Sequence, residues 1–163
     1  MVEVESISLK SLFEKKLVIP EYQRPYVWRE EHINDLLEDW KDHFFDELNF
    51  KDDALEYFMG SIMIHNNNGV YEVIDGQQRL TTLLIMDYVW NEEEAVLKKG
   101  NFNFNYQSKI SENHIKQNRN QLASLKGSLI AQAFNAILKK LVFSIIITKS
   151  EDDAFVFFES QNN

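Results

Sequence analysis

The stretch at residues 70–84, VYEVIDGQQRLTTLL, changes its hydrophobic period at Asp75 and Gly76. Before this point, β-branched and aromatic residues alternate along residues 70–74, which predicts a strand. After it, apolar residues recur at helical spacing: Leu80, Leu83, Leu84 and Tyr88. The sequence therefore predicts a strand that turns sharply into a helix, and the rest of the fold must accommodate this unit.

The start of this predicted helix is a candidate anion site. The first N–H groups of a helix have no partner within the helix, and the helix dipole is positive at this end. Gly76 lets a ligand approach the backbone, and the side chains of Gln77, Gln78 and Arg79 add donors. The planar guanidinium of Arg79 suits phosphate oxygens. The alternative is that Asp75 and Gln78 form a capping box that only starts the helix, with Arg79 as a solvated surface charge.

A second unusual segment, PEYQRPYVWRE, lies at residues 20–30. It contains both prolines of the chain and three large aromatic residues: Tyr22, Tyr26 and Trp28. Proline restricts the backbone, so this loop loses little entropy when it is held in one shape. Its aromatic rings can stack on a base or fill the core. We expect Trp28 and one tyrosine to be buried, and Gln23 and Arg24 to be presented to a ligand.

The remaining pattern predicts an α+β fold in a chain of 163 residues with 44% hydrophobic content. Asn and Gly at residues 66–69 predict a hairpin turn between strands at 57–65 and 70–74. Gly60 within the first of these strands indicates a bulge or a close approach of another group. Another strand is expected at 141–148. Helices are expected at 7–16, at 30–48, from 77 towards 99, at 124–140 and after Asp152. The polar segment at 111–121 is expected to be mobile.

Composition excludes several classes of protein. The absence of cysteine excludes disulfides, thiolate metal sites and a cysteine nucleophile. The sequence shows no membrane-length apolar run and no signal peptide, so we expect a cytoplasmic protein. The net charge of −9 argues against a protein that coats nucleic acid by charge alone, although lysines concentrated at residues 98–149 leave room for a local basic patch.

Three segments, in order, resemble the N-terminal domain of GmrSD-type restriction endonucleases: IPEYQRPYVW at 19–28, YFMGSIMI at 57–64 and VIDGQQRLTTL at 73–83. The ending DAFVFFESQNN is similar to the Phe-Glu-x-x-Asn segment of the family, with Asn162 at the Asn position. The resemblance implies a ParB/sulfiredoxin-like fold, in which helices pack on a small mixed sheet with a β-hairpin at about residues 57–74. It also implies a single domain over residues 1–163.

The resemblance further implies a domain that binds a nucleoside triphosphate (NTP) with Mg²⁺ and regulates a restriction or phage-defence nuclease. The residues that match the nucleotide-binding motifs are Tyr22, Gln23, Arg24, Gly76, Gln77, Gln78, Arg79 and Asn162. Asp75, Gln78 and Arg79 are the expected catalytic residues if the NTP is hydrolysed, and Asp75 is also the candidate Mg²⁺ ligand. The implied partners are the NTP, DNA and a nuclease domain or subunit.

Full-length members of the family continue past the Asn segment with Arg-Gly and a helical region, and many carry a separate HNH nuclease domain. This chain ends at Asn163, and Gln161 stands where the family tends to have an apolar residue. We therefore expect a domain that is truncated at its C-terminus and has no nuclease chemistry of its own. The alternative is a non-catalytic DNA- or protein-interaction module that keeps the fold.

Overall fold

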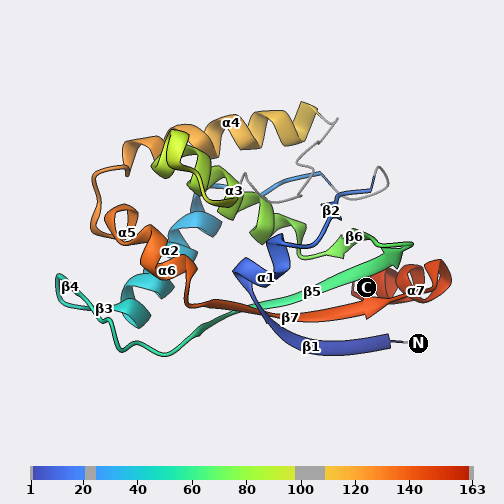
Figure 1. Cartoon of the computed structure of the whole chain (residues 1–163). Coiled ribbons are helices and arrows are strands. Elements are labelled where there is room, and N and C mark those ends of the chain that lie inside the picture. Colours follow the sequence, from blue (N-terminus) through green and yellow to red (C-terminus); the bar gives the residue numbers. More distant parts are fainter. Residues whose placement is uncertain (1, 21–24, 98–108, 162–163) are drawn as a thin grey trace.

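A mixed β-sheet with helices on both faces organises the chain (Figure 1). The computed structural model describes residues 2–20, 25–97 and 109–161. The sheet has the strand order β1-β7-β5-β6-β2, and a small separate hairpin pairs β3 with β4. The strands are β1 (Val2–Ser8), β2 (Leu17–Val18), β3 (Phe45–Asp46), β4 (Asn49–Phe50), β5 (Tyr57–Asn67), β6 (Val70–Asp75) and β7 (Leu141–Thr148). The predicted α+β class is confirmed.

The helices lie between these strands and after the last one. They are α1 (Leu9–Phe13), α2 (Glu30–Phe44), α3 (Gln77–Asn91), a 3₁₀ turn η1 (Glu92–Glu94), α4 (Lys109–Ser124), α5 (Leu129–Gln132), α6 (Phe134–Leu138) and α7 (Glu151–Gln161). In the part of the chain that the structure describes, no helix has the length and apolar character needed to cross a membrane.

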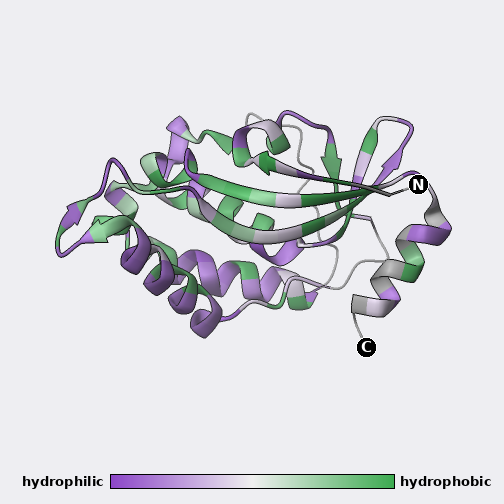
Figure 2. Ribbon diagram, turned by 90° about the horizontal axis from the view of Figure 1, so that it is seen from below, coloured by the Kyte–Doolittle hydropathy of each residue, from purple (hydrophilic) through white to green (hydrophobic). Residues whose placement is uncertain are grey.

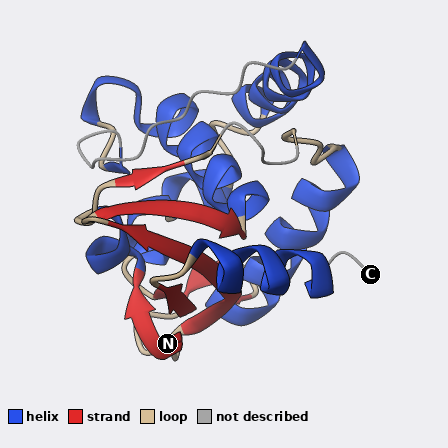
Figure 3. Cartoon of the chain, turned by 90° about the vertical axis from the view of Figure 1, so that its right-hand side faces the viewer, coloured by secondary structure: helices blue, strands red, loops and turns tan. Residues whose placement is uncertain are grey.

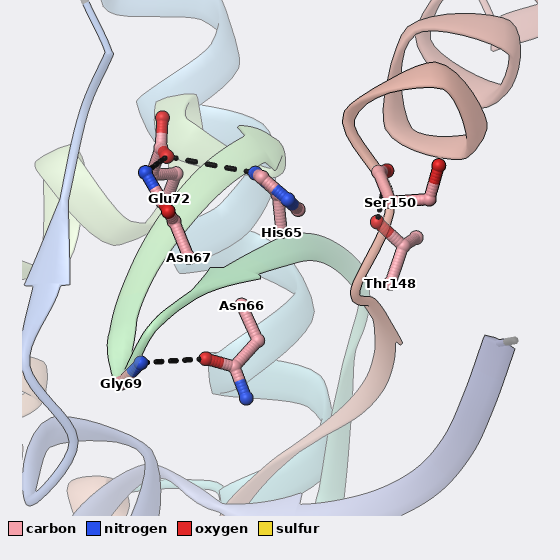
Figure 4. Close-up of polar contacts among 7 residues, drawn as sticks. All are labelled: His65, Asn66, Asn67, Gly69, Glu72, Thr148 and Ser150. Atoms are coloured by element: carbon pink, nitrogen blue, oxygen red, sulfur yellow. Dashed lines mark hydrogen bonds and ion pairs between the residues drawn. The ribbon is translucent and has the colours of Figure 1, made fainter.

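The predicted hairpin joins β5 and β6, which pair antiparallel. Its turn contains Asn68 and Gly69, whose φ angles are 53° and 89°, and Gly69 N donates to Asn66 Oδ1 at 2.9 Å. Figure 4 shows this bond and the nearby side chains of His65 and Glu72, whose Nδ1 and Oε1 atoms lie 3.5 Å apart. Because Asn and Gly adopt positive φ at low cost, this turn fixes the register that delivers β6 to the candidate site.

The core fills the side of the sheet that faces α1, α2, α3 and α6. Alternate residues of β7 point into this core, namely Leu141, Phe143, Ile145 and Ile147. In Figure 2 the central strands carry much of the hydrophobic colour, whereas outer helix surfaces are hydrophilic. Helix α7 packs across the opposite face and contacts β5, β6 and β7, as Figure 3 shows. The β6–α3 junction is thus held between two packed layers.

Several predicted elements differ from the observed ones. Residues 2–8 form a strand, β1, that pairs with β7, so the expected helix at 7–16 is reduced to α1. Helix α2 ends at Phe44 rather than near residue 48, because the chain turns into the β3–β4 hairpin. The polar segment expected to be mobile belongs to a helix, α4, and the helix expected at 124–140 is divided into α5 and α6.

Helix α3 is tied to the segment that follows it by the buried carboxylate of Asp87. Its Oδ1 accepts from Asn91 Nδ2 at 2.8 Å and from Val96 N at 2.9 Å, and its Oδ2 accepts from Leu97 N at 2.6 Å. Asp87 is 1% exposed, so its carboxylate has little access to water and depends on these donors. The carboxylate therefore substitutes for helical hydrogen bonds where the helix ends.

We predict that Asp87→Ala lowers the free energy of unfolding by about 2–3 kcal/mol, because it leaves buried N–H groups without an acceptor. Denaturant unfolding followed by circular dichroism measures this change. Glu93→Ala, at an exposed position in η1, is the control and is expected to change stability by less than about 0.5 kcal/mol. An Asp87→Ala protein as stable as the wild type would contradict the role given to this carboxylate.

Candidate functional site

The backbone of the turn between β6 and α3 packs closely against strand β5. Gly76 has a φ of 98°, and a Cβ at this position would lie 2.9 Å from Ile62 Cγ1. Gly76 occupies the N-cap position, and no side chain caps α3. The alternative in which Asp75 and Gln78 form a capping box is therefore wrong, because Gly76 takes the N-cap position and has no side chain to bond the helix. The positive end of the helix dipole therefore carries no side-chain cap from a described residue.

The first residue of α3, Gln77, has a buried side chain. It is 1% exposed, yet neither its Nε2 nor its Oε1 makes a hydrogen bond to any residue that the structure describes. A carboxamide offers two donor hydrogens and an acceptor oxygen, and burying it unpaired is costly. The unpaired carboxamide of Gln77 therefore lowers the stability of the folded chain.

Arg79 projects from the first turn of α3 and lies against Gly60 of β5. A Cβ on Gly60 would lie 2.6 Å from Arg79 Nη1, so the absence of a side chain there makes room for the guanidinium. Gly60 also coincides with a register shift in the β5–β7 pairing, which confirms the predicted bulge and close approach. The Arg79 side chain is exposed and makes no ion pair with a described residue. It remains available to an anion.

The charge of Arg79 also reaches Tyr57 on β5. Burial and the neighbouring Asp39 carboxylate raise the pKa of Tyr57, and Arg79 partly offsets this rise. The phenol therefore stays neutral at physiological pH. Beside Tyr57, the guanidinium of Arg79 is a positive charge and the carboxylate of Asp39 is a negative one.

Gln78 points the other way, towards the proline-containing loop. Its Oε1 accepts from Val27 N at 2.8 Å, and its Nε2 donates to Pro25 O at 3.0 Å. One side chain thus joins the turn to the residues that directly follow Tyr22, Gln23 and Arg24. The two sequence segments that we singled out are therefore adjacent in the fold.

The same loop is anchored by the buried side chain of Tyr26. Its hydroxyl bonds with Thr82 Oγ1 and accepts from Asn118 Nδ2, both at 2.8 Å, and its backbone N donates to Ser111 Oγ at 2.8 Å. Burial raises the pKa of Tyr26, and its hydrogen bonds to Thr82 and Asn118 reduce that rise. Tyr26 is thus the buried tyrosine that the sequence predicted, and it connects the loop to both α3 and α4. Trp28 is half-buried and stacks on His32 with ring centroids 5.5 Å apart.

Among the residues predicted for the site, the structure places Asp75, Gly76, Gln77, Gln78 and Arg79 in one turn. Tyr22, Gln23, Arg24 and Asn162 lie outside the described residues. Sequence reasoning missed Thr82, Ser111 and Asn118 because their role depends on contacts between distant segments. A polar residue at a helical position that should be apolar, such as Asn118, is the signal that could have identified them.

We predict that Gln78→Met releases the loop from the turn, because methionine fills the space but replaces neither hydrogen bond. Hydrogen exchange at the Val27 amide should become faster, and the free energy of unfolding should fall by about 1–2 kcal/mol. Mass-spectrometric or NMR exchange experiments measure the first effect. Gln117→Met, at an exposed position of α4, is the matched control. Unchanged protection of Val27 in the Gln78 variant would rule out this role.

Comparison with known proteins supports the identification of these segments. No curated protein matches the chain. A family model described as the N-terminal domain of GmrSD restriction endonuclease matches residues 9–163, which include the turn, the loop and every strand of the sheet except β1. The match covers almost the whole sequence, so the chain belongs to the GmrSD restriction endonuclease N-terminal domain family.

Proposed function

We propose that the turn from Asp75 to Arg79 binds the phosphate groups of a nucleoside triphosphate, and that the chain is a nucleotide-binding regulatory domain. Family membership supports a role in a restriction system, a nuclease system that defends against phage. The observation that carries the nucleotide part of the proposal is the uncapped start of α3 beside the unpaired carboxamide of Gln77.

The electrostatics of α3 favour an anion. This helix is 15 residues long and has no acidic residue in its first turn. Backbone N–H groups at such an end, together with the helix dipole, attract phosphate oxygens. Arg79 adds a full positive charge with two parallel donors, which is the geometry that phosphate accepts best. The net charge of the chain is −9, so this concentration of donors contrasts with the acidic character of the chain as a whole.

Gln77 supplies a donor that folding alone leaves unused. Its buried Nε2 gains a partner if a phosphate oxygen reaches the first turn, and this gain adds to affinity rather than to stability. The neighbouring Gln78 has a different task. Since both ends of its carboxamide bond the loop, we propose that it positions residues 25–27 beside the nucleotide.

A Mg²⁺ ion that accompanies a triphosphate is usually held by one or two carboxylates, phosphate oxygens and waters, and it neutralises phosphate charge. Asp75 fits the role of such a single carboxylate at the end of β6. The described His, Asp and Glu residues form no group of three that could hold a metal without a nucleotide. Hydrolysis of the NTP by Asp75, Gln78 and Arg79 stays a prediction.

DNA binding is a second candidate function, because α4 exposes a row of basic and amide side chains. These are Lys116, Gln117, Arg119 and Asn120. Lys and Arg contact phosphates and amides can read base edges. Against this, Glu92 and Glu93 line the groove beside Arg119 and reduce its positive potential. A gel shift with duplex DNA in the absence of nucleotide would favour this second function.

We predict that Arg79→Ala weakens NTP binding by about 10- to 100-fold, the effect of losing charge-assisted hydrogen bonds. Calorimetric titration with each common NTP and Mg²⁺ measures the affinity, and inorganic phosphate tests how much the nucleoside contributes. Arg119→Ala removes the same charge from α4 and should leave affinity unchanged. Equal binding by the wild type and Arg79→Ala proteins would remove the proposal.

A second variant separates binding from folding. Gln77→Met removes an unpaired buried amide, so stability should stay the same or rise while NTP affinity falls. Thermal unfolding without ligand and calorimetric titration give the two quantities. A Gln77→Met protein with lowered stability and unchanged affinity would show that the carboxamide is structural.

A further inference from the structure

A continuous chain of hydrogen bonds runs from the middle of α4 to the first turn of α3. Asn118 Nδ2 donates to the Tyr26 hydroxyl at 2.8 Å. This hydroxyl bonds Thr82 Oγ1 at 2.8 Å, and Thr82 Oγ1 donates to Gln78 O at 2.8 Å. Because threonine has one hydroxyl hydrogen, and that hydrogen goes to Gln78 O, Tyr26 must be the donor to Thr82. All three bonds therefore point in the same direction, from α4 to α3.

The chain of bonds is buried and ends on a peptide group of the candidate site. Tyr26 and Thr82 have no exposed surface, and hydrogen bonds in series away from water polarise one another. The last acceptor, Gln78 O, belongs to the same peptide group as Arg79 N. This N–H lies in the first turn of α3, where helix geometry supplies no acceptor. A bond accepted by the carbonyl thus strengthens a donor that faces the proposed phosphate position.

At its other end, the chain of bonds reaches a half of α4 that has few buried residues. Between Lys109 and Asn118, only Ser111 and Asn118 are buried, and both are polar. Tyr26 N donates to Ser111 Oγ at 2.8 Å, and Asn118 Nδ2 donates to Trp28 O at 2.8 Å. The buried side chains of this half of α4 therefore bond one short segment, residues 26–28, which Gln78 also holds.

The second half of α4 has anchors that do not involve this segment. Trp90 Nε1, on α3, donates to Leu122 O at 2.8 Å, and Leu122 is fully buried. Gln121 Nε2 donates to Asn34 Oδ1 on α2 at 2.9 Å. The two halves of α4 are thus attached to different parts of the molecule, and only residues 109–118 depend on the loop beside the candidate site.

We propose that the first half of α4 is coupled to nucleotide binding through the hydroxyls of Tyr26 and Thr82. This inference rests on the proposed function. A phosphate oxygen that accepts from Arg79 N polarises the peptide group of Gln78 O, which strengthens each bond back to Asn118. Coupling is reciprocal, so docking of α4 raises the affinity for the NTP by the same factor. Figure 1 shows α4 lying over α3, on the side away from the sheet, where a partner that contacts α4 would sense the nucleotide.

The variant Thr82→Val tests the coupling, because valine keeps the branched shape of threonine but neither accepts from Tyr26 nor donates to Gln78 O. Hydrogen exchange is measured with and without ATP, GTP, CTP or UTP, each with Mg²⁺. In the wild type, nucleotide should slow exchange at residues 109–118 by about fivefold, and less at 119–124. Thr82→Val should bind about fivefold more weakly and lose the slowing, and Thr82→Ser, which keeps a hydroxyl, should restore both.

Two further variants separate the coupling from stability. Tyr26→Phe keeps the ring but breaks the same chain of bonds, so it should behave as Thr82→Val does. Thr148→Val removes another buried hydroxyl, which donates to Ser150 O at 3.1 Å, and should leave the affinity and the slowing unchanged.

Calorimetric titration distinguishes the two ways in which the inference fails. A wild type that binds no NTP overturns the proposed function and this inference with it. A wild type that binds an NTP while exchange at residues 109–118 stays the same overturns the inference alone. Slowing that persists in both Thr82→Val and Tyr26→Phe does so as well.

Discussion

The carboxamide of Gln78 holds together the part of the molecule on which the candidate site depends. Its two hydrogen bonds join the start of α3 to backbone atoms 51 and 53 residues earlier in the chain. Each bond adds only about 1 kcal/mol to stability, but together they satisfy a donor and an acceptor of residues 25–27, which belong to no helix or strand. Tyr26 adds a buried anchor to the same loop through α3 and α4. These contacts therefore hold residues 25–27 and the turn together.

Two glycines place this unit on the sheet. Gly76 brings the turn against Ile62, and Gly60 leaves space for the guanidinium of Arg79 on the same strand. Other buried polar side chains, such as Asp87 and Asn118, are hydrogen-bonded, whereas Trp40 Nε1, His114 Nδ1 and Gln121 Oε1 have no partner among the described residues. For Gln77, neither polar atom of the carboxamide has a partner in the part of the chain that the structure describes. Polar groups held at a cost to folding are characteristic of binding sites, which is why the turn carries our functional proposal.

Local patterns in the sequence were sufficient to predict the strand-turn-helix and the hairpin. The change of period at Asp75 and Gly76 and the turn residues at 66–69 act over a few positions, so a single sequence reveals them. The strand at residues 2–8 was missed because its pairing with β7 joins distant segments. The direction of Gln78 towards the loop was missed for the same reason. Residue types indicated which side chains carry chemistry, whereas their partners depend on tertiary contacts that no local pattern encodes.

The most direct test of the account is an NMR titration of the wild-type chain with an NTP and Mg²⁺, observing backbone and side-chain amides together. The account predicts that the largest shifts occur at the backbone amides of Gln77, Gln78 and Arg79 and at the side-chain amide of Gln77, which should also become protected from exchange with water. Shifts confined to α4 or to the β3–β4 hairpin, with the turn unaffected at saturating nucleotide, would contradict the claim that the start of α3 is the phosphate site.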